Sequence, residues 1–299
     1  MSQNIQQLQG VEISVWQRLR DRKAWIIPTL KDPRWIFACV LGTSVLLGHF
    51  VLSFNRSPQQ MVAAIATCTF LDVLYTWVLT RKLLFPLSAL ISAFGLIILF
   101  SAPGATWLMI LVSWICITAK NLITWRGHHI YNPTNFALVV MILISGGQAS
   151  ISPSYQWGGN FWITVLVLSL GLVMMWRVNK LPAVLPFWAV YTFGAFVRSQ
   201  LGNLLFDIAM WATVSSGEFM LYSFFMITDP KTSPSSTKGM VLYGVCIGLA
   251  EMCFELNNAV FSFFYAAFFV STCRFAIVVT KDLFQMRRST RIDERMQAV

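Results

Sequence analysis

The sequence is a succession of long apolar blocks separated by short polar segments, and this pattern constrains the fold more than any other feature. A helix of ~20 apolar residues crosses a bilayer, where lipid offers the backbone no hydrogen-bond partner. Only 11% of the residues are charged, against about 25% in soluble domains. We therefore predict an all-α polytopic membrane protein with about ten transmembrane helices, at 35–54, 61–79, 83–101, 105–119, 131–147, 159–176, 181–199, 200–228, 239–256 and 258–279.

The basic residues support this division and orient it. If the N-terminus is cytoplasmic, 19 of the 22 basic residues fall at cytoplasmic ends; Arg56 and Arg198 fall at outer ends and Arg274 lies within the last span. The positive-inside rule predicts such a bias. It places both termini in the cytoplasm, in an inner, plasma or thylakoid-type membrane. It also supports one net crossing for 200–228, with a break at 215–217.

The net charge of +10 is explained by topology, because the basic residues form no continuous face that would track a nucleic acid. The expected organisation is a cytoplasmic or interfacial segment at 1–33, a single transmembrane domain at 34–279 and a basic cytoplasmic tail at 280–299. The transmembrane domain divides into halves at about 34–147 and 159–279. Residues 1–33 do not resemble a cleavable signal peptide. The lipid bilayer is the first expected partner.

Two polar segments interrupt the apolar pattern, at 126–136 and 225–234. Each places a proline beside Asn or Asp at the mouth of a span, where proline fits the first turn of a helix and displaces the preceding residue from helical geometry. Paired interruptions in the two halves are typical of inverted repeats with a central site. The alternative interpretation, ordinary capped helix ends at the membrane surface, remains open from spacing alone.

The same segments carry a family resemblance. Ser88-Ala89-Leu90-Ile91, Lys120 and His129-Ile130-Tyr131-Asn132-Pro133, followed by 224–234 (FFMITDPKTSP), resemble the superfamily that contains the Rnf D subunit and the B subunit of sodium-translocating NADH–quinone reductase. The closest similarity is to the UnbU-like branch of enediyne biosynthesis clusters, which also shares Gln156-Trp157-Gly158. The resemblance covers about 80–275. It implies two inverted five-helix repeats with broken helices, a urea-transporter-like fold and membrane electron transfer with flavin.

The resemblance departs from the redox subunits at one point. Their S-G-A-T sequence holds FMN through a threonine phosphoester, whereas Ser145 to Ser150 contain no threonine. We therefore expect no covalent FMN, and a noncovalent flavin or quinone at a central site. The residues expected to bind it are Lys120, Asn132, Pro133, Asn135, Thr228, Asp229, Pro230 and Lys231.

Other cofactors are not expected. The six cysteines are scattered without metal-ligand spacing, which argues against an iron–sulfur cluster or another metal site. Haem would require histidines facing each other at one depth. His49 lies toward the outer end of its span, away from His128 and His129, so haem is not predicted.

Acidic residues within the apolar spans are candidates for an ion or proton pathway, because a charge in the bilayer interior costs at least ~2.5 kcal/mol. The candidates are Asp72, Glu218 and Glu251. The alternative is a carboxylate paired with a basic residue at a helix end or near the interface, which we favour for Asp207 and Glu255.

Three functions remain open. The first is a redox-linked membrane protein, coupled to ion transport and supplied with electrons by a partner subunit. The second is a transporter or channel for a small solute or ion on the same fold. The third is a non-catalytic membrane partner of a biosynthetic complex. No catalytic residue is assigned.

Overall fold

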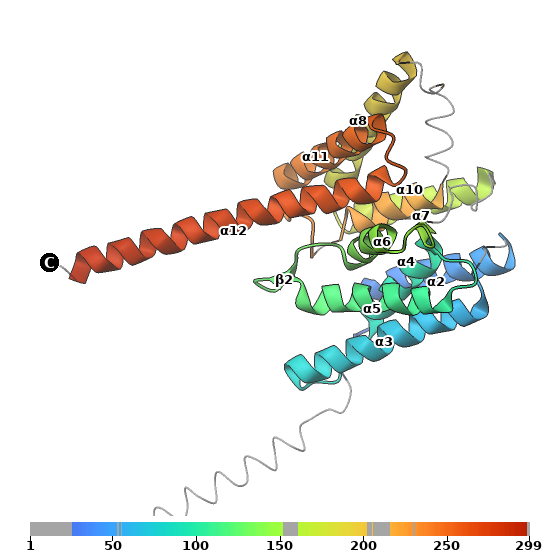
Figure 1. Cartoon of the computed structure of the whole chain (residues 1–299), viewed down its shortest axis with the longest axis horizontal. Coiled ribbons are helices and arrows are strands. Elements are labelled where there is room, and N and C mark those ends of the chain that lie inside the picture. The colour runs from blue at the N-terminus through green and yellow to red at the C-terminus, as the bar shows by residue number, and fades with distance from the viewer. Residues whose placement is uncertain are drawn as a thin grey trace, which may run out of the picture.

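The computed structural model describes residues 26–52, 54, 56–151, 161–201, 205, 216–229 and 231–297, and their architecture is helical (Figure 1). The N-terminal half contains α2 (Arg34–Phe50), α3 (Pro58–Thr80), α4 (Leu87–Leu99), α5 (Thr106–Leu122) and α6 (Pro133–Ile144). The C-terminal half contains α7 (Phe161–Arg177), α8 (Leu181–Gln200), α10 (Gly217–Leu221), the π-helix η2 (Tyr222–Met226), α11 (Thr237–Leu256) and α12 (Ser262–Gln297).

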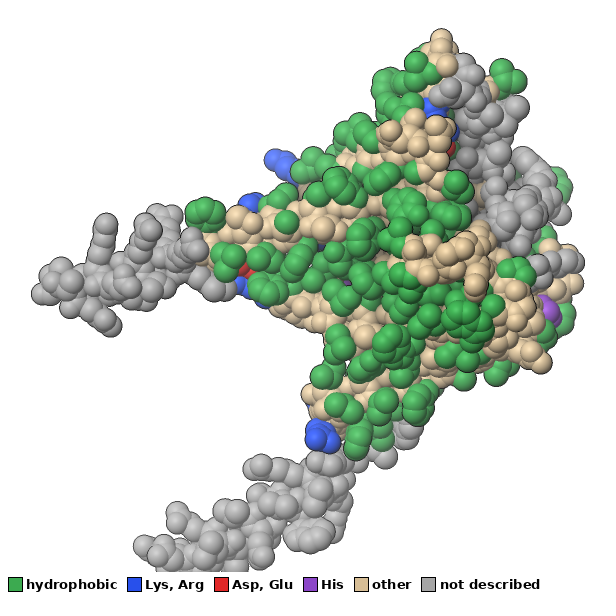
Figure 2. All heavy atoms as spheres, viewed as in Figure 1, with side chains coloured by type: hydrophobic (Ala, Val, Ile, Leu, Met, Phe, Trp, Pro, Cys, Tyr) green, Lys and Arg blue, Asp and Glu red, His purple; other side chains and the backbone are tan. Residues whose placement is uncertain are grey.

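The helices have the length and surface of a membrane protein. In the described part of the chain, four helical stretches are long and apolar enough to cross a bilayer: Pro58–Thr80, Leu181–Gln200, Thr237–Leu256 and Ser262–Phe284. Hydrophobic side chains cover most of the visible bundle surface, and most visible Lys and Arg side chains gather on the side from which α12 extends (Figure 2). Outward-facing apolar side chains are expected where lipid is the solvent. The prediction of a helical membrane protein is confirmed.

Local sequence explains where several helices begin. Ser57 and Gln60 form a capping box ahead of Pro58 at the start of α3. Ser236 caps α11 by accepting a hydrogen bond from the Gly239 amide at 3.2 Å. These side chains satisfy amides that the first helical turn leaves without partners.

Two helices are shorter than the predicted spans at 83–101 and 131–147. Helix α4 has 13 residues and α6 has 12, so each is about 18–20 Å long, less than the ~30 Å hydrocarbon core. The chain then becomes extended, and strand β1 (Phe100–Ser101) pairs antiparallel with β4 (Ser150–Ile151). The apolar pattern continues from α4 into Phe100, so the sequence did not mark the end of α4, whereas Gly146-Gly147 lie just after the end of α6 and mark it closely.

A buried arginine supports the end of α4. Arg56 is 3% exposed and donates hydrogen bonds to the Ile97 carbonyl at 3.2 Å and to Ser101 Oγ at 3.2 Å. Burial lowers the pKa of Arg56 to about 10. The Arg56 guanidinium therefore holds the end of α4 in place. It does so at the predicted outer end of a span, where the positive-inside rule alone would disfavour a cation.

Each half contains closely packed helices. Helix α3 packs against α5 and α5 against α6; α8 packs against α11 and α11 against α12. The α8–α11 approach is close enough that a Cβ at Gly244 would lie 2.2 Å from the Ala183 carbonyl oxygen. The halves meet in several places, including α6 against α12 and Phe37 of α2 against Phe225 of η2, whose ring centroids are 5.3 Å apart.

The predicted span at 258–279 is the beginning of a longer helix. Helix α12 continues for 36 residues, from Ser262 to Gln297, and its C-terminal part extends away from the bundle (Figure 1). The tail at 280–299 is thus helical through Gln297. Of the predicted span 200–228, the structure describes 200, 201, 205 and 216–228, and its break falls partly outside the described residues.

Candidate functional site

The two polar interruptions meet in space. The Asn132 side-chain amide, Nδ2, donates a hydrogen bond to Asp229 Oδ2 at 3.3 Å. Asn132 also caps α6, because its Oδ1 accepts from the Asn135 amide at 3.1 Å. Asp229 Oδ1 accepts from the Lys231 amide at 3.0 Å. Each side chain therefore organises its own segment with one atom and reaches the other segment with its second. We call the contact between Asn132 and Asp229 the junction.

Buried polar residues lie directly behind the junction. Thr228 is 4% exposed, and its hydroxyl donates to the Phe224 carbonyl. Asn135 is 2% exposed, and its Nδ2 donates to the Phe264 carbonyl of α12 at 3.2 Å. Asn135 Oδ1 is buried and has no hydrogen-bond partner among the described residues. A buried acceptor without a partner costs free energy, so Asn135 offers an acceptor to a bound molecule.

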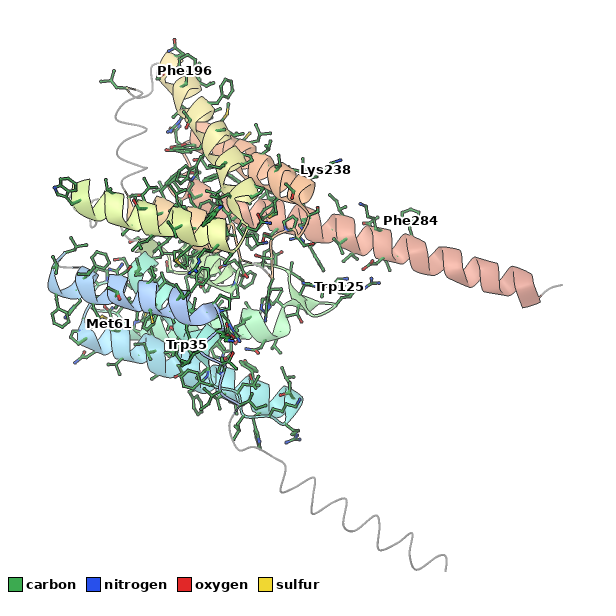
Figure 3. All side chains as sticks on the ribbon, turned by 180° about the vertical axis from the view of Figure 1, so that it is seen from behind. Trp35, Met61, Trp125, Phe196, Lys238 and Phe284 are labelled. Atoms are coloured by element: carbon green, nitrogen blue, oxygen red, sulfur yellow. The ribbon has the colours of Figure 1, made fainter. Side chains whose placement is uncertain are left out.

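Basic groups surround the junction. Lys180, at the start of α8, donates through Nζ to Ser233 Oγ at 2.8 Å and to the Pro234 carbonyl at 3.3 Å. Lys231 is exposed and lies within electrostatic reach of Lys120 and Asp229. Arg274 of α12 donates to the Thr232 carbonyl. In Figure 3, Lys238 and Trp125 mark this end of the bundle, on the side from which α12 extends.

The charges at the junction perturb one another. Burial raises the pKa of Asp229, opposed by the hydrogen bond from Lys231 and by the charges of Lys231 and Lys180. Burial lowers the pKa of Lys180, and Asp229 acts in the opposite direction. Burial, followed by the charge of Lys120, lowers the pKa of Lys231. The arrangement is a partly desolvated, predominantly positive site, which suits an anionic or carbonyl-rich ligand.

Lys120 and Asp72, assigned to different roles from the sequence, are partners. Lys120 Nζ lies 2.7 Å from Asp72 Oδ1 and donates to Ser88 Oγ at 2.6 Å. The two residues are 9% and 8% exposed. Their contact ties α3, α4 and α5 together beside the junction, and Asp72 is thus a paired carboxylate.

A hairpin joins the junction to α12. Strands β2 (Thr124–Trp125) and β3 (His128–His129) pair across a turn in which Arg126 and Gly127 have positive φ, the geometry of a tight hairpin turn. Trp125 Nε1 donates to Asp282 Oδ2 at 3.0 Å, and Arg126 lies 3.1 Å from Asp282 Oδ1. The first interruption is therefore braced against the last helix.

His129 leads from this hairpin into the first motif. Burial, reinforced by the charges of Lys231 and Lys120, lowers its pKa to about 4, so the imidazole is neutral near pH 7. Its Nδ1 is buried and without a partner among the described residues. His129 thus adds a second neutral polar atom to the surroundings of the junction.

Glu251 and Glu255 lie in another part of the C-terminal half. Glu255 forms an ion pair with Arg198. Glu251 is 1% exposed and accepts a hydrogen bond from Ser262 Oγ at 3.1 Å. Glu218 belongs to α10, but its side chain lies outside the described residues, as do Asp207 and Pro230. The structure thus separates Glu251 and Asp72 onto different halves.

The remaining sequence candidates have definite places. Pro133 is the buried first residue of α6. Ser145 ends α6, 13 positions after Asn132 and about 20 Å along the helix, so the Ser145–Ser150 segment lies far from the junction. His49 is in the last turn of α2, about 22 Å from Arg34 at its start. Within the described residues, no group of three or more His, Cys, Asp and Glu side chains is placed to hold a metal ion.

Sequence reasoning missed several residues at this end of the protein. In the sequence, Lys180 looks like a topological charge and Ser233 like a turn residue. Their contact spans 53 residues, so the local sequence does not reveal it. Asp282 falls within the polar tail. Arg274 carried a usable signal, since a basic residue within an apolar span is a functional candidate by default.

Comparisons with known proteins point to one superfamily. Residues 154–277 match the family model described as the NQR2, RnfD, RnfE family. The chain is 34% identical over 95 residues to the D subunit of an ion-translocating oxidoreductase complex from Shewanella pealeana, which covers 30% of this chain and 26% of that protein. It is 33% identical over 96 residues to the corresponding D subunit from Cellvibrio japonicus, covering 29% and 25%.

These matches support the superfamily resemblance of the motifs. The family match includes Asp229, Lys180 and the whole of α11, and thus the C-terminal side of the junction. The aligned segment spans about a quarter of the length of the two curated relatives.

Proposed function

We propose that the chain is a membrane-embedded, electron-transport-type protein of the superfamily that contains the Rnf D subunit and the NADH–quinone reductase B subunit, and that it binds flavin or quinone noncovalently at the junction. The observation that carries the proposal is the hydrogen bond between Asn132 and Asp229. It brings together the two motifs on which the superfamily resemblance rests. The basic groups around them provide the electrostatic environment for a molecule that accumulates negative charge on reduction.

The polar groups present fit a flavin better than a quinone. A flavin ring offers both N–H donors and carbonyl acceptors, whereas a quinone offers carbonyl acceptors alone. The junction supplies a cationic donor in Lys231, with Lys180 beside it, and an acceptor in the unpaired Oδ1 of Asn135. Lys120 is already paired with Asp72. When bound, such a cofactor supplies the electron-transfer chemistry, and the protein residues hold and orient it.

The architecture proposed for this function is an inverted repeat. The pairing of α3 with α5 and α5 with α6 corresponds to that of α8 with α11 and α11 with α12. Each half also contributes one polar interruption to the junction. An odd number of crossings per half would give the second half the opposite orientation, with the site at the repeat interface.

We propose that the junction faces the cytoplasm. Lys120, Lys180, Lys231 and Arg126 all lie at this end, as the positive-inside rule requires of a cytoplasmic surface. The curated relatives are named as subunits of an ion-translocating oxidoreductase complex. A cytoplasmic or membrane partner subunit would accordingly deliver or receive the electrons.

Purification in detergent tests the proposal. We expect flavin or quinone to copurify, or added FMN to bind with quenching of its fluorescence. Lys231→Ala weakens binding by on the order of tenfold, as expected for loss of a charge-assisted contact. Lys238→Ala is the matched control, because Lys238 is an exposed lysine at the same end of the bundle. A protein that carries and binds neither cofactor contradicts the proposal.

One observation favours a transporter as the second candidate. Helices α4 and α6 are short and lead into paired extended segments, and broken helices of this kind line solute and ion sites in transporters. Solute flux into proteoliposomes, abolished by Asp229→Ala in a folded protein without cofactor, would support this function over the first.

A further inference from the structure

An apolar groove lies on the surface of the protein between α3 and α5. It is lined by residues within 66–71 of α3 and 107–114 of α5, and its volume is about 930 Å³, within the ~300–1,000 Å³ usual for ligand pockets. Its lining includes the rings of Phe70, Trp107 and Trp114, which are 67%, 58% and 47% exposed. Because Ala66 and Thr67 are small, they leave room between these rings.

The groove lies near the middle of the bilayer. Helices α3 and α5 pack against each other, with Tyr75 Oη 3.0 Å from Thr118 Oγ1. Thr67 precedes Arg81, the C-cap of α3, by 14 positions and is thus about 21 Å away along the helix. A bilayer measures ~40–45 Å with its headgroups, so one leaflet has the same depth. With Arg81 at the level of the headgroups, the groove is close to the midplane.

Trp114 is unusual for a tryptophan that only faces lipid. Tryptophan concentrates at membrane–water interfaces, where its N–H group meets water or headgroups. Trp114 instead lies eight residues before the end of α5 at Leu122, about 12 Å along the helix, and its ring lines the groove. A rigid, flat wall for an apolar chain accounts for a tryptophan at this depth.

An exposed stripe on α3 leads from the groove to a basic end of the helix. Phe70, Leu74, Trp77 and Arg81 follow one another at intervals of four, three and four residues, so they share one face of α3. All four are exposed. The C-terminal end of α3 lies on the side of the bundle from which α12 extends (Figure 1). The stripe therefore continues the groove toward the junction end of the protein.

Arg81 and Lys82 place two positive charges at the end of this stripe. Arg81 ends α3 in the left-handed conformation, with φ at 57°, and its guanidinium lies 5.4 Å from the centre of the Trp77 ring. This cation–π contact holds the charge over the stripe. Among the described residues, neither Arg81 nor Lys82 forms an ion pair with an acidic side chain. Both charges are therefore available to an anion at the membrane surface.

We propose that the groove and the Arg81–Lys82 pair form a binding site for one anionic phospholipid from the leaflet at the junction end. The headgroup contacts Arg81 and Lys82, one acyl chain follows the stripe past Trp77, and the end of this chain lies in the groove. Basic residues beside transmembrane helices bind acidic headgroups in the same way. The site goes beyond the proposed function, because it uses the exposed face of α3 and α5 and no residue of the junction.

The dimensions favour an acyl chain over a transmembrane helix of a partner. The α5 side of the groove runs from Trp107 to Trp114, about 10 Å, whereas a helix that crosses the membrane passes through ~30 Å of hydrocarbon. Beyond the groove the stripe ends at two cations, which an anionic headgroup complements and an apolar helix does not.

A photoreactive phospholipid tests the site. The protein is reconstituted in phosphatidylcholine bilayers that contain a small amount of phosphatidylglycerol or phosphatidylcholine with a diazirine at the end of one chain. After illumination, mass spectrometry of the digested protein maps the adducts. We expect the phosphatidylglycerol adducts to concentrate in 66–71 and 107–114. There they exceed the phosphatidylcholine adducts by on the order of tenfold, because two cations attract the anionic headgroup.

Two variants separate the headgroup from the chain. Arg81→Gln with Lys82→Gln lowers the phosphatidylglycerol adducts in the groove to the level of phosphatidylcholine. Ala66→Trp fills the groove and lowers the adducts of both lipids there severalfold. The matched controls lie on α11: Lys238→Gln changes an exposed lysine, and Leu249→Trp adds a large ring at a position that is 49% exposed. Both controls keep the wild-type pattern.

Three results overturn the site: adducts spread evenly over the exposed helices, equal labelling by the two lipids, or unchanged labelling in Ala66→Trp. A photoreactive amino acid in place of Trp114 extends the test to native membranes. Lipid adducts there support the proposal, whereas a polypeptide adduct assigns the groove to a partner helix and overturns it. FMN titration of the same variants is expected to match wild type, so loss of the lipid site leaves the cofactor proposal standing.

Discussion

Asn132 and Asp229 stand 97 residues apart in the sequence, and the amide of the first donates a hydrogen bond to the carboxylate of the second at 3.3 Å. Asn132 begins α6, and Asp229 follows the π-helix η2. The bond therefore joins the N-terminal half to the C-terminal half at the places where each departs from regular helix. This relationship defines the candidate site.

Removing the Asn132 side chain tests the energetic role of the junction. Asn132→Ala loses the cap of α6, which typically contributes about 0.5–2 kcal/mol, and a hydrogen bond to a charged group, about 1.5–3 kcal/mol. Ser236→Ala removes a comparable cap from α11 without touching Asp229. We expect the free energy of unfolding in mixed micelles to fall more for Asn132→Ala. Equal losses in the two variants would mean that the junction bond contributes nothing.

The buried pair of Asp72 and Lys120 is predicted to be structural. Asp72→Asn alone destabilises the protein by about 3–5 kcal/mol, because it leaves Lys120 buried without a counter-charge. The double variant Asp72→Asn with Lys120→Met loses less than the sum of the single changes, as contacting residues do. Thermal unfolding in detergent measures all three. Additive losses would show that the two side chains act independently.

His129 gives the stability of the protein a pH dependence of known sign. Its pKa in the folded protein is about 4, below the usual value of 6.5. Between these two pH values His129 is protonated in the unfolded chain and neutral in the folded protein. The contribution of His129 to stability is present above about pH 6.5 and is lost as the pH falls toward 4. Between pH 6.5 and pH 4, we expect the melting temperature of His129→Gln to fall by less than that of the wild-type protein. Identical profiles would contradict the assignment.

The brace between the hairpin and α12 predicts a proteolysis phenotype. Asp282 holds Trp125 and Arg126, so Asp282→Ala frees the hairpin and speeds tryptic cleavage after Arg126, whose side chain is exposed. Lys281→Ala is the control, because Lys281 is the neighbouring exposed residue of α12. It removes the tryptic site after Lys281 but leaves the rate of cleavage after Arg126 unchanged. Mass spectrometry of the digests distinguishes the sites. Unchanged cleavage after Arg126 in Asp282→Ala would contradict the brace.

Much of the helical pattern was predictable from hydropathy and local capping residues. The predicted spans at 61–79, 181–199 and 239–256 correspond closely to α3, α8 and α11, because apolar length and cap residues are local signals. Asn132-Pro133 correctly marked the start of α6 for the same reason. The early end of α4 was missed, since its apolar character continues into β1, whereas Gly146-Gly147 placed the end of α6 to within three residues.

The site was only partly predictable, for a physical reason. Motif residues such as Asn132 and Asp229 are recognisable by type and spacing, whereas their contact with each other depends on tertiary structure. Lys180 joins the site through Ser233, 53 residues away, and nothing in its local sequence separates it from a topological charge.

Cross-linking of the two motifs tests the central claim most directly. Asn132→Cys and Asp229→Cys are introduced together in a variant whose six native cysteines are serine, and a short bifunctional thiol reagent is applied in native membranes. The pair Trp125→Cys with Asp282→Cys provides the positive control. We predict a cross-linked peptide that joins the two motifs and forms more slowly when FMN is present. Efficient cross-linking of the control pair with none between positions 132 and 229 would contradict it.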